Sequence, residues 1–451
     1  MNRVTTSLAD LQLARYPEPK EAREPLRAWD AADEYLLRHV TGTVPAGGGP
    51  DPARAANAGP VDLSGTVVVL GDRWGALVTA LAEYGPVQVT DSYLTQLATR
   101  ANLARNGVPG DAVRLASTTD EPPERIDVLL VRIPKSLALL EDQLTRLARH
   151  IHPGTVVAGA GMVTEIHTST LNLFERIIGP TRTSLAVRKG RLIFSVPDPD
   201  RIAPATQWPR TFSLPADVGL AAGRTVVNHG GVFAGERLDV GARFFLRHLP
   251  WEPGTALAPG RRPTRIADLG CGNGVLGLAA SLAHPDAEVV FVDESYQALA
   301  SARSTMLVNG LLAGDPGAGS GGAGGAAEGG PGPGAPGAGA ISSTLGPDFG
   351  RGGIGRARFL LQDGLSGVPA DSFDLVLNNP PFHTHQTTTD MTAWRMFNDS
   401  KAALRPGGEL WAVGNRHLGY HVKLRRVFGN SELVASDAKF VVLRAVKEPR
   451  G

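Results

Sequence analysis

The stretch RIADLGCGNG, residues 265–274, decides how the second half of this chain folds. A short apolar run gives way to alternating glycines, and Val275 to Ala283 then has the composition of a buried helix. A strand that turns sharply into a helix is the start of an α/β unit. Glycines let the turn adopt positive φ and let a ligand approach the backbone closely. The stretch therefore predicts an α/β domain with a ligand-binding turn, although a tight turn that binds nothing has the same pattern.

Acidic residues follow the next two predicted strands. Asp293 ends the strand Glu288 to Val292, 23 positions after Gly270, a spacing at which a carboxylate binds ribose hydroxyls. Asp363 follows the strand Ala357 to Leu361, where it would lie near an adenine. In a parallel sheet covered by helices on both faces, ligands bind at the carboxyl ends of the strands. These elements together predict one site for an adenosine-type ligand.

The glycine pattern differs from that of dinucleotide-binding proteins. DLGCGNG lacks the spacing GxGxxG and is similar to the first motif of class I methyltransferases, which implies S-adenosylmethionine as the cofactor. Phe233 either covers this cofactor or belongs to the core. The predicted cofactor-binding residues are Asp268, Gly270, Gly272, Gly274, Asp293, Asp363 and Phe233.

The sequence Asn379-Pro380-Pro381-Phe382 follows the predicted strand Phe373 to Leu377 and is the candidate catalytic site. An exocyclic amine of a base is a weak nucleophile because its lone pair is delocalised into the ring. The side-chain oxygen of Asn379 and the carbonyl of Pro380 can each accept one N–H of that amine and direct its lone pair at the methyl donor. Phe382 would stack on the base, which must leave any helix to enter the pocket. A rigid turn without a catalytic role is the alternative.

No metal site is predicted. His383 and His385 stand two residues apart in a loop, where histidines are usually solvated, and they are assigned no role. One cysteine and scattered histidines do not make a zinc site.

The N-terminal half repeats the plan of the C-terminal half. The strand Thr66 to Leu70 ends in a glycine and Val87 to Thr90 ends in Asp91, as the later strands end in a glycine and in Asp293. The run Ile126 to Val131 resembles the run FDLVL of the later copy. We therefore expect two tandem class I, Rossmann-like domains.

The ends of two predicted helices extend the repeat. One helix closes with Asn106-Gly107 and the later one with Asn309-Gly310. Asn106 precedes Asp127 by 21 residues, whereas Asn309 precedes Asp374 by 65. The difference is about the length of the Gly/Pro-rich tract 312–353, which is predicted to be a disordered insertion.

The N-terminal copy differs where the chemistry would occur. Gly71-Asp72-Arg73-Trp74-Gly75 replaces GCGNG, and the large Arg73 and Trp74 would close the space that a cofactor needs. Aligning Asp127 with Asp374 places Arg132-Ile133-Pro134-Lys135 at the position of NPPF. The N-terminal copy is therefore predicted to be degenerate. Its Arg132 and Lys135 either help to hold nucleic acid, or the domain persists as a packing partner.

The domain boundaries follow from composition. Residues 1–200 form the degenerate domain, with 43–60 flexible, and the Pro-rich stretch 201–223 is the linker. Residues 224–451 form the catalytic domain.

Composition excludes several classes of protein. The 451 residues carry a net charge of +1, which excludes a generally basic protein of the histone type but not a local basic groove. No apolar stretch approaches the roughly 18 residues of a membrane span, and the start lacks a secretory signal. A single cysteine, Cys271, favours the cytoplasm.

The motifs together resemble the RsmC/RlmG family of two-domain ribosomal RNA guanine-N2 methyltransferases. DLGCGNGVLGL, NNPPFH and the tandem copies are similar to the family at large. Residues 26–35 (LRAWDAADEY), 166–171 (IHTSTL) and 413–421 (VGNRHLGYH) look like the large-subunit branch. The resemblance implies S-adenosylmethionine as cofactor, 23S ribosomal RNA as partner, and methylation of a guanine N2. It also implies a silent N-terminal domain. We expect a monomer.

Other functions suit the same motifs. A protein glutamine side-chain amide (N5), a guanine N2 of 16S ribosomal RNA or a DNA adenine would fit the NPPF acceptors, and a non-catalytic RNA-binding factor is a further class. The basic segment Gly419 to Arg426 is either a solvated helix face or a contact to RNA phosphates.

Overall fold

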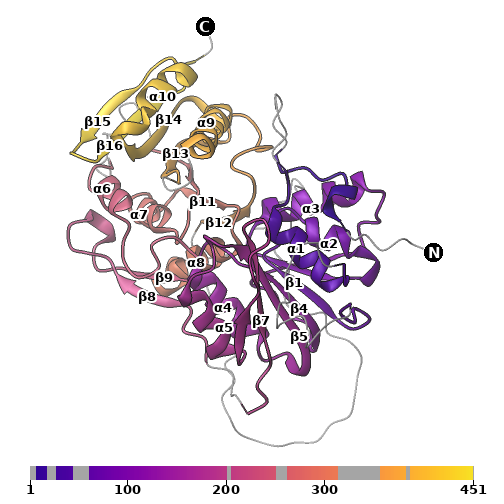
Figure 1. The fold of residues 1–451 in the computed structure, drawn as a ribbon. Helices are drawn as coiled ribbons and strands as arrows, with labels where there is room; N and C mark the ends of the chain where they lie inside the picture. Colours follow the sequence, from indigo (N-terminus) through magenta and orange to yellow (C-terminus); the bar gives the residue numbers. More distant parts are fainter. Residues whose placement is uncertain are drawn as a thin grey trace, which may run out of the picture. The chain divides into compact units, whose positions relative to one another are not determined.

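The computed structural model describes residues 7–17, 27–43, 60–200, 205–249, 262–312, 356–381 and 386–449, with no description of the side chains of 386–390 (Figure 1). The predicted flexible segment 43–60, apart from its two end residues, and the predicted insertion 312–353, apart from its first residue, lie outside the described residues.

The chain divides into two compact units. Unit 1 comprises Met1–Phe212, Val227–Asp239 and Glu294–Ser301, and unit 2 comprises Ser213–Val226, Val240–Asp293 and Ala302–Gly451.

A seven-stranded sheet forms the centre of unit 1, in the order β3-β2-β1-β4-β5-β7-β6. The strands from β3 to β5 are parallel, whereas β7 is antiparallel to both of its neighbours. The elements are α1 (Ala31–Val40), β1 (Val67–Leu70), α2 (Ala76–Ala80), β2 (Val87–Thr90), α3 (Tyr93–Arg105), β3 (Arg114–Ser117), β4 (Ile126–Arg132), α4 (Leu137–Leu147), β5 (Ile151–Met162), α5 (Thr168–Ile177), β6 (Thr181–Thr183) and β7 (Gly190–Ser195).

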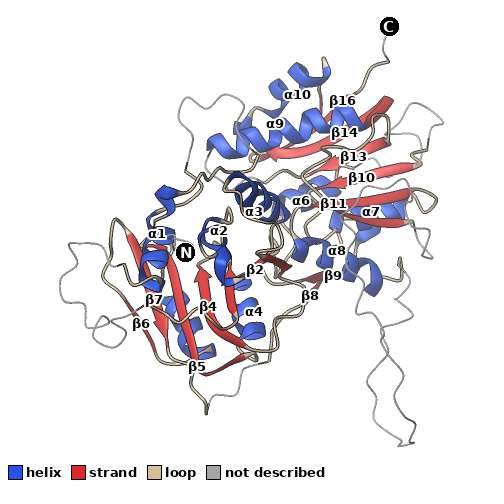
Figure 2. Cartoon of the chain, turned by 90° about the vertical axis from the view of Figure 1, so that its right-hand side faces the viewer, coloured by secondary structure: helices blue, strands red, loops and turns tan. Residues whose placement is uncertain are grey.

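The sheet of unit 2 has the same order, β12-β11-β10-β13-β14-β16-β15, with β16 as the antiparallel strand. Figure 2 shows α9 and α10 together on one side of β14 and β16. The remaining elements of the chain are β8 (Arg210–Ser213), β9 (Thr225–Asn228), α6 (Val240–Leu246), β10 (Arg265–Leu269), α7 (Val275–Ala283), β11 (Glu288–Asp293), α8 (Tyr296–Val308), β12 (Ala357–Leu361), β13 (Phe373–Asn378), α9 (Gln386–Ala403), β14 (Leu404–Asn415), α10 (Tyr420–Phe428), β15 (Glu432–Ser436) and β16 (Phe440–Val446), and β8 pairs with β9.

Helices cover both faces of each sheet because the strands carry apolar residues on both faces. In β1, Val67 and Val69 belong to a core cluster with α1 and α2, whereas Val68 and Leu70 belong to a second cluster with α4 and α5. Side chains of a strand alternate between the two faces of a sheet. A continuous run of buried apolar residues is therefore what a parallel strand between two helical layers requires.

Equal strand order confirms the predicted fold class, two tandem Rossmann-like methyltransferase domains. One side-chain contact repeats as well. Asn106 accepts a hydrogen bond from the amide of Gln12 at 2.9 Å and donates one to its carbonyl at 2.9 Å. Asn309 makes the same pair of bonds with Thr225, at 3.3 and 2.7 Å.

The strand register corrects one predicted equivalence. The amide of Gly71 donates a hydrogen bond to the carbonyl of Val89, and the amide of Gly270 donates one to the carbonyl of Val292. Because these glycines are equivalent, the position after Val89 corresponds to the position after Val292. Thr90, not Asp91, is therefore the counterpart of Asp293.

Two further findings concern membrane spans and metal ligands. Within the part of the chain that the structure describes, no helix combines the length and apolarity of a membrane span. The same residues contain no group of three or more His, Cys, Asp and Glu side chains placed to bind a metal ion.

Candidate active site

The glycine turn lies between β10 and α7, as the sequence predicts. Gly270, Gly272 and Gly274 have φ values of 71°, 52° and 77°, in the left-handed region that glycine adopts without steric cost. A Cβ atom on Gly274 would come within 2.8 Å of the Cβ of Ala302, so this glycine allows α7 to pack against α8. A Cβ atom on Gly272 would meet no atom within 4 Å. The backbone at Gly272 therefore has open space beside it, which a ligand can approach.

Asp293 lies next to this turn. Its strand β11 is the parallel neighbour of β10, and the Asp293 carboxylate accepts a hydrogen bond from the amide of Gly272 at 3.0 Å. The two predicted cofactor elements are therefore together, although they are 21 residues apart in the chain.

Asp268 lies below the turn. It is fully buried, and its carboxyl accepts a hydrogen bond from the amide of Gly277 at 2.8 Å, in the first turn of α7. Burial, more than the nearby Asp293, raises the pKa of Asp268 to about 8. Asp268 thus supports the start of α7 from inside the protein and has no surface that a ligand can touch.

Asp363 follows β12, the strand beside β11, and is largely buried. Its carboxylate forms an ion pair with Arg395 of α9. The same helix brings Met396 close to the turn, because a Cβ atom on Gly270 would lie 3.1 Å from the Met396 Cε. Neither Arg395 nor Met396 is among the residues predicted from the sequence. Their sequence signal is that they lie between two and three helical turns into α9, the helix that follows NPPF.

Asn379 begins the loop that leaves β13. Asn378, the last residue of that strand, pairs with Leu269 in the sheet and donates a side-chain hydrogen bond to the Leu269 carbonyl at 2.8 Å. Asn379 is half-buried, Pro380 is buried and Pro381 is exposed. The predicted stacking residue Phe382 lies outside the described residues, as do His383 and His385.

Strand pairing brings the predicted elements to one edge of the sheet. The strands β12, β11, β10 and β13 are adjacent and parallel, so Asp363, Asp293, the glycine turn and Asn379 follow carboxyl ends that point the same way. A ligand lying along this edge would meet carboxylates first and then the open space beside the backbone of Gly272. An amide oxygen and a proline carbonyl would follow, which are acceptors for an amine.

Phe233, the last of the predicted cofactor-binding residues, does not belong to the same unit as the others. It is 55% exposed and belongs to the segment Val227–Asp239 of unit 1, whereas the glycine turn belongs to unit 2. Its predicted role in covering the cofactor stays a prediction.

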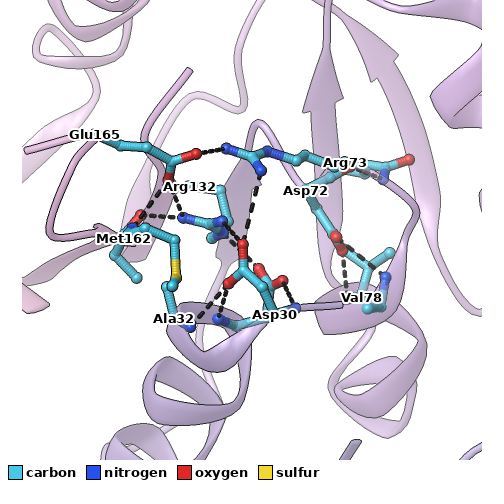
Figure 3. A network of polar contacts seen from close by, with 12 residues as sticks. Asp30, Ala32, Asp72, Arg73, Val78, Arg132, Met162 and Glu165 are labelled. Carbon is cyan, nitrogen blue, oxygen red and sulfur yellow. Dashed lines mark hydrogen bonds and ion pairs between the residues drawn. The ribbon is translucent and has the colours of Figure 1, made fainter. Parts of the chain in front are cut away.

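The equivalent site in unit 1 is filled by a charged network (Figure 3). Arg132 is fully buried and donates to the carboxylates of Asp33 and Asp30 at 2.5 and 2.9 Å. Arg73, which stands where the other copy has Gly272, forms an ion pair with Glu165. Our expectation that Arg132 holds nucleic acid is therefore wrong, because Asp30 and Asp33 at the start of α1 bind it inside the domain. Lys135 is exposed.

A carboxylate has also changed position in unit 1. Val69 stands where the other copy has Asp268, and Asp72 of the turn accepts hydrogen bonds from the amides of Ala76 and Val78 at 3.0 and 2.9 Å. Burial, and then the charge of Asp33, raise the pKa of Asp72 to about 7. The start of α2 is thus stabilised by a carboxylate of the turn and not by one of the strand.

Known proteins match both halves of the chain. A family model described as "RLMG N-terminal domain" matches residues 1–199, and one described as "Methyltransferase small domain" matches residues 223–314 and 351–444. The protein named ribosomal RNA large subunit methyltransferase G of Streptomyces coelicolor is 57% identical over 445 residues, covering 99% of this chain and 100% of its own length. The protein of the same name from Klebsiella pneumoniae is 39% identical, covering 96% of each.

One solved structure resembles the chain over most of its length. It is the T. thermophilus 16S rRNA N2 G1207 methyltransferase in complex with AdoMet and guanosine, with a TM-score of 0.61 and 22% identity. The likeness covers 85% of this chain and 88% of that one, and it shows the common fold.

Proposed function

We propose, because this chain belongs to the ribosomal RNA large subunit methyltransferase G family, that it transfers a methyl group from S-adenosylmethionine to the exocyclic N2 of a guanine in 23S ribosomal RNA. The large-subunit RNA follows the name of the relatives. The guanine N2 follows the family that the motifs resemble, and it is also the target in the name of the T. thermophilus enzyme. We also propose that the protein acts as a monomer in the cytoplasm.

One observation carries the proposal: the glycine turn and the Asn379 loop leave adjacent strands from the paired residues Leu269 and Asn378. A methyl donor and a methyl acceptor bound by these two loops would therefore be neighbours, as direct displacement requires.

The residues of the edge fit S-adenosylmethionine, which supplies an electrophilic methyl group on a sulfonium. Asp293 accepts hydrogen bonds from the ribose hydroxyls, and Asp363 accepts one from the adenine amine. The open backbone at Gly272 accommodates the methionine part. Gly270 and Gly274 shape the turn, and Asp268 supports it from below.

Asn379 and Pro380 act on the substrate amine. Each offers one oxygen to one N–H, which removes rotational freedom from the amine and keeps its lone pair directed at the methyl carbon. Pro381 holds the loop rigid, and Phe382 stacks on the flipped base. No strong general base is needed, because the amine becomes acidic only as the new bond forms.

The two domains have different roles in this proposal. Residues 224–451 perform catalysis, 201–223 link the domains, and residues 1–200 are catalytically silent and either bind RNA or serve as a structural partner. Two substitutions support a catalytically silent N-terminal domain. Arg132 stands where the C-terminal copy has Asn379, and Thr90 stands where it has Asp293.

Methyl transfer from labelled cofactor to protein-free ribosomal RNA tests the proposal. We expect label in 23S RNA, and digestion to nucleosides followed by mass spectrometry should find N2-methylguanosine. The purified protein should be offered 16S RNA, a peptide release factor and DNA in parallel. Label in the release factor, in DNA adenine or only in 16S RNA would replace this function with one of the alternatives. Absence of transfer to every substrate, with RNA binding intact, would favour a non-catalytic factor.

A further inference from the structure

A small pocket in unit 1 borders the charged network at Asp30 and is lined mostly by residues of segment 26–35, which the sequence analysis singles out. Its volume is about 190 Å³. Sites for small molecules usually measure about 300–1,000 Å³, so this one suits a single ring system. The residues that matter for its chemistry are Arg27, Trp29, Tyr35 and Arg188.

Two aromatic side chains form part of the wall. Trp29 precedes the N-cap residue of α1, and Tyr35 lies within that helix. Both are partly exposed and pack against the apolar core of unit 1, which fixes their rings. The Arg27 guanidinium lies 5.0 Å from the centroid of the Trp29 ring. Fixed rings beside a guanidinium plane are the surfaces on which unpaired bases stack.

The carboxylates that line the pocket are already neutralised. Glu34 forms a salt bridge with Arg38, and Asp30 forms one with the buried Arg132. Among the described residues, no carboxylate pairs with Arg27 or Arg188. The pocket therefore presents two guanidinium groups, those of Arg27 and Arg188, to which the described residues supply no carboxylate.

A tight turn beside the pocket provides an independent observation. The amide and carbonyl of Val187 bond to those of Gly190, both at 2.8 Å, and enclose Arg188 and Lys189. Both residues are exposed and have positive φ, 49° and 68°. Turns of this shape favour Asn-Gly, because other side chains are strained there. Two cations thus occupy positions where the backbone favours other residues, and strain of this kind gathers at functional sites.

We propose that this pocket binds one unpaired nucleotide of an RNA, with the base on Trp29 and Tyr35 and the adjoining phosphates on Arg27, Arg188 and Lys189. The choice of RNA rests on the proposed function. A phosphate binds well to guanidinium groups, and a base fills the space beside the rings.

The test compares RNA affinities of full-length variants. The double variant Arg188→Asn/Lys189→Gly places the favoured residues in the turn, so we expect a higher Tm together with weaker binding of a short single-stranded RNA. The slope of log K against log salt should become shallower by about 1.4, since each contact to a single-strand phosphate contributes about 0.7. Arg114→Asn/Arg149→Asn, at exposed positions of the same unit, removes the same charge and should leave affinity nearly unchanged.

The stacking part is tested by Trp29→Leu. Single-strand affinity should fall roughly five- to hundredfold, whereas affinity for the matching duplex should not change. Thermal unfolding of the Trp29→Leu variant checks that this variant is folded. Equal single-strand affinity in wild type, Trp29→Leu and Arg188→Asn/Lys189→Gly would overturn the proposal, as would equal losses for the Arg114→Asn/Arg149→Asn control. If these variants lose RNA affinity while the wild type methylates no RNA, the pocket stands and the proposed catalytic function fails.

Discussion

Arg132 ends β4 at the register position from which Asn379 follows β13, because Val131 pairs with Leu70 as Asn378 pairs with Leu269. The two residues face opposite environments. Asn379 is half-buried at the sheet edge, whereas Arg132 is enclosed by the carboxylates of Asp30 and Asp33. The same backbone position therefore presents the proposed amine acceptor in one copy and an internal ion pair in the other.

Replacing Arg132 with Ala should destabilise unit 1 by about 3–5 kcal/mol, because it leaves the buried carboxylate of Asp33 without its counter-ion. Urea unfolding followed by circular dichroism measures the change. The control Arg149→Ala alters an exposed arginine and should change stability by less than about 0.5 kcal/mol. Stability equal to wild type in Arg132→Ala would contradict the structural role of this residue.

Replacing Asn379 with Ala should lower kcat for methyl transfer by roughly 10²–10³-fold, the usual cost of removing one preorganised polar group. The Kd for S-adenosylmethionine, measured by calorimetry, should stay near the wild-type value, because the proposal places Asn379 against the substrate amine and not against the cofactor. Asn398→Ala is the matched control, since Asn398 is an exposed residue of α9. Full activity of the Asn379 variant would refute the assignment of the amine acceptor.

Replacing Asp293 with Ala should raise the Kd for S-adenosylmethionine about tenfold or more, because hydrogen bonds to a charged acceptor are lost. The loss of the bond to Gly272 adds to this effect by loosening the turn. Calorimetric titration without RNA isolates the cofactor step. Asp286→Ala, at an exposed position shortly before β11, serves as the control. Unaltered cofactor affinity in the Asp293 variant would remove Asp293 from the site.

Replacing Asp268 with Asn should flatten the dependence of stability on pH. The unfolded chain ionises Asp268 near the ordinary pKa of 3.8, whereas the folded chain keeps the proton up to about pH 8. Between these values the folded state binds more protons, so this residue makes stability fall as pH rises, by about 1.4 kcal/mol per pH unit. Urea unfolding of the ligand-free variant and of the wild type at several pH values gives the slope of stability against pH for each protein. Parallel curves for the variant and the wild type would contradict the buried, protonated state.

The sequence was sufficient to predict the parts of the site that follow strand ends. The glycine turn and Asp293 lie together as expected, because adjacent parallel strands bring consecutive loops together, and the structure adds a hydrogen bond between them. The predicted helix Val275 to Ala283 is confirmed with the same bounds. These features depend on local patterns, and local patterns are visible in one sequence.

Features that depend on distant partners could not be predicted. Arg132 looked like a surface cation because its partners Asp30 and Asp33 precede it by about a hundred residues. Asp91 looked equivalent to Asp293 because an acidic residue closes both strands, and only the hydrogen-bond register reveals the shift to Thr90. Arg395 meets Asp363 through the packing of α9, which no short motif encodes.

The different position of the supporting carboxylate, on the strand in one copy and in the turn in the other, makes it difficult to convert one copy into the other by single substitutions. Placing cysteine, the residue of the other copy, at Asp72 alone would leave the amides of Ala76 and Val78 without their acceptor, and placing aspartate at Val69 alone would bury an acid in addition to Asp72. Each single substitution toward the other copy is therefore expected to give a less stable protein. Folding stability alone thus favours keeping the present residues of unit 1.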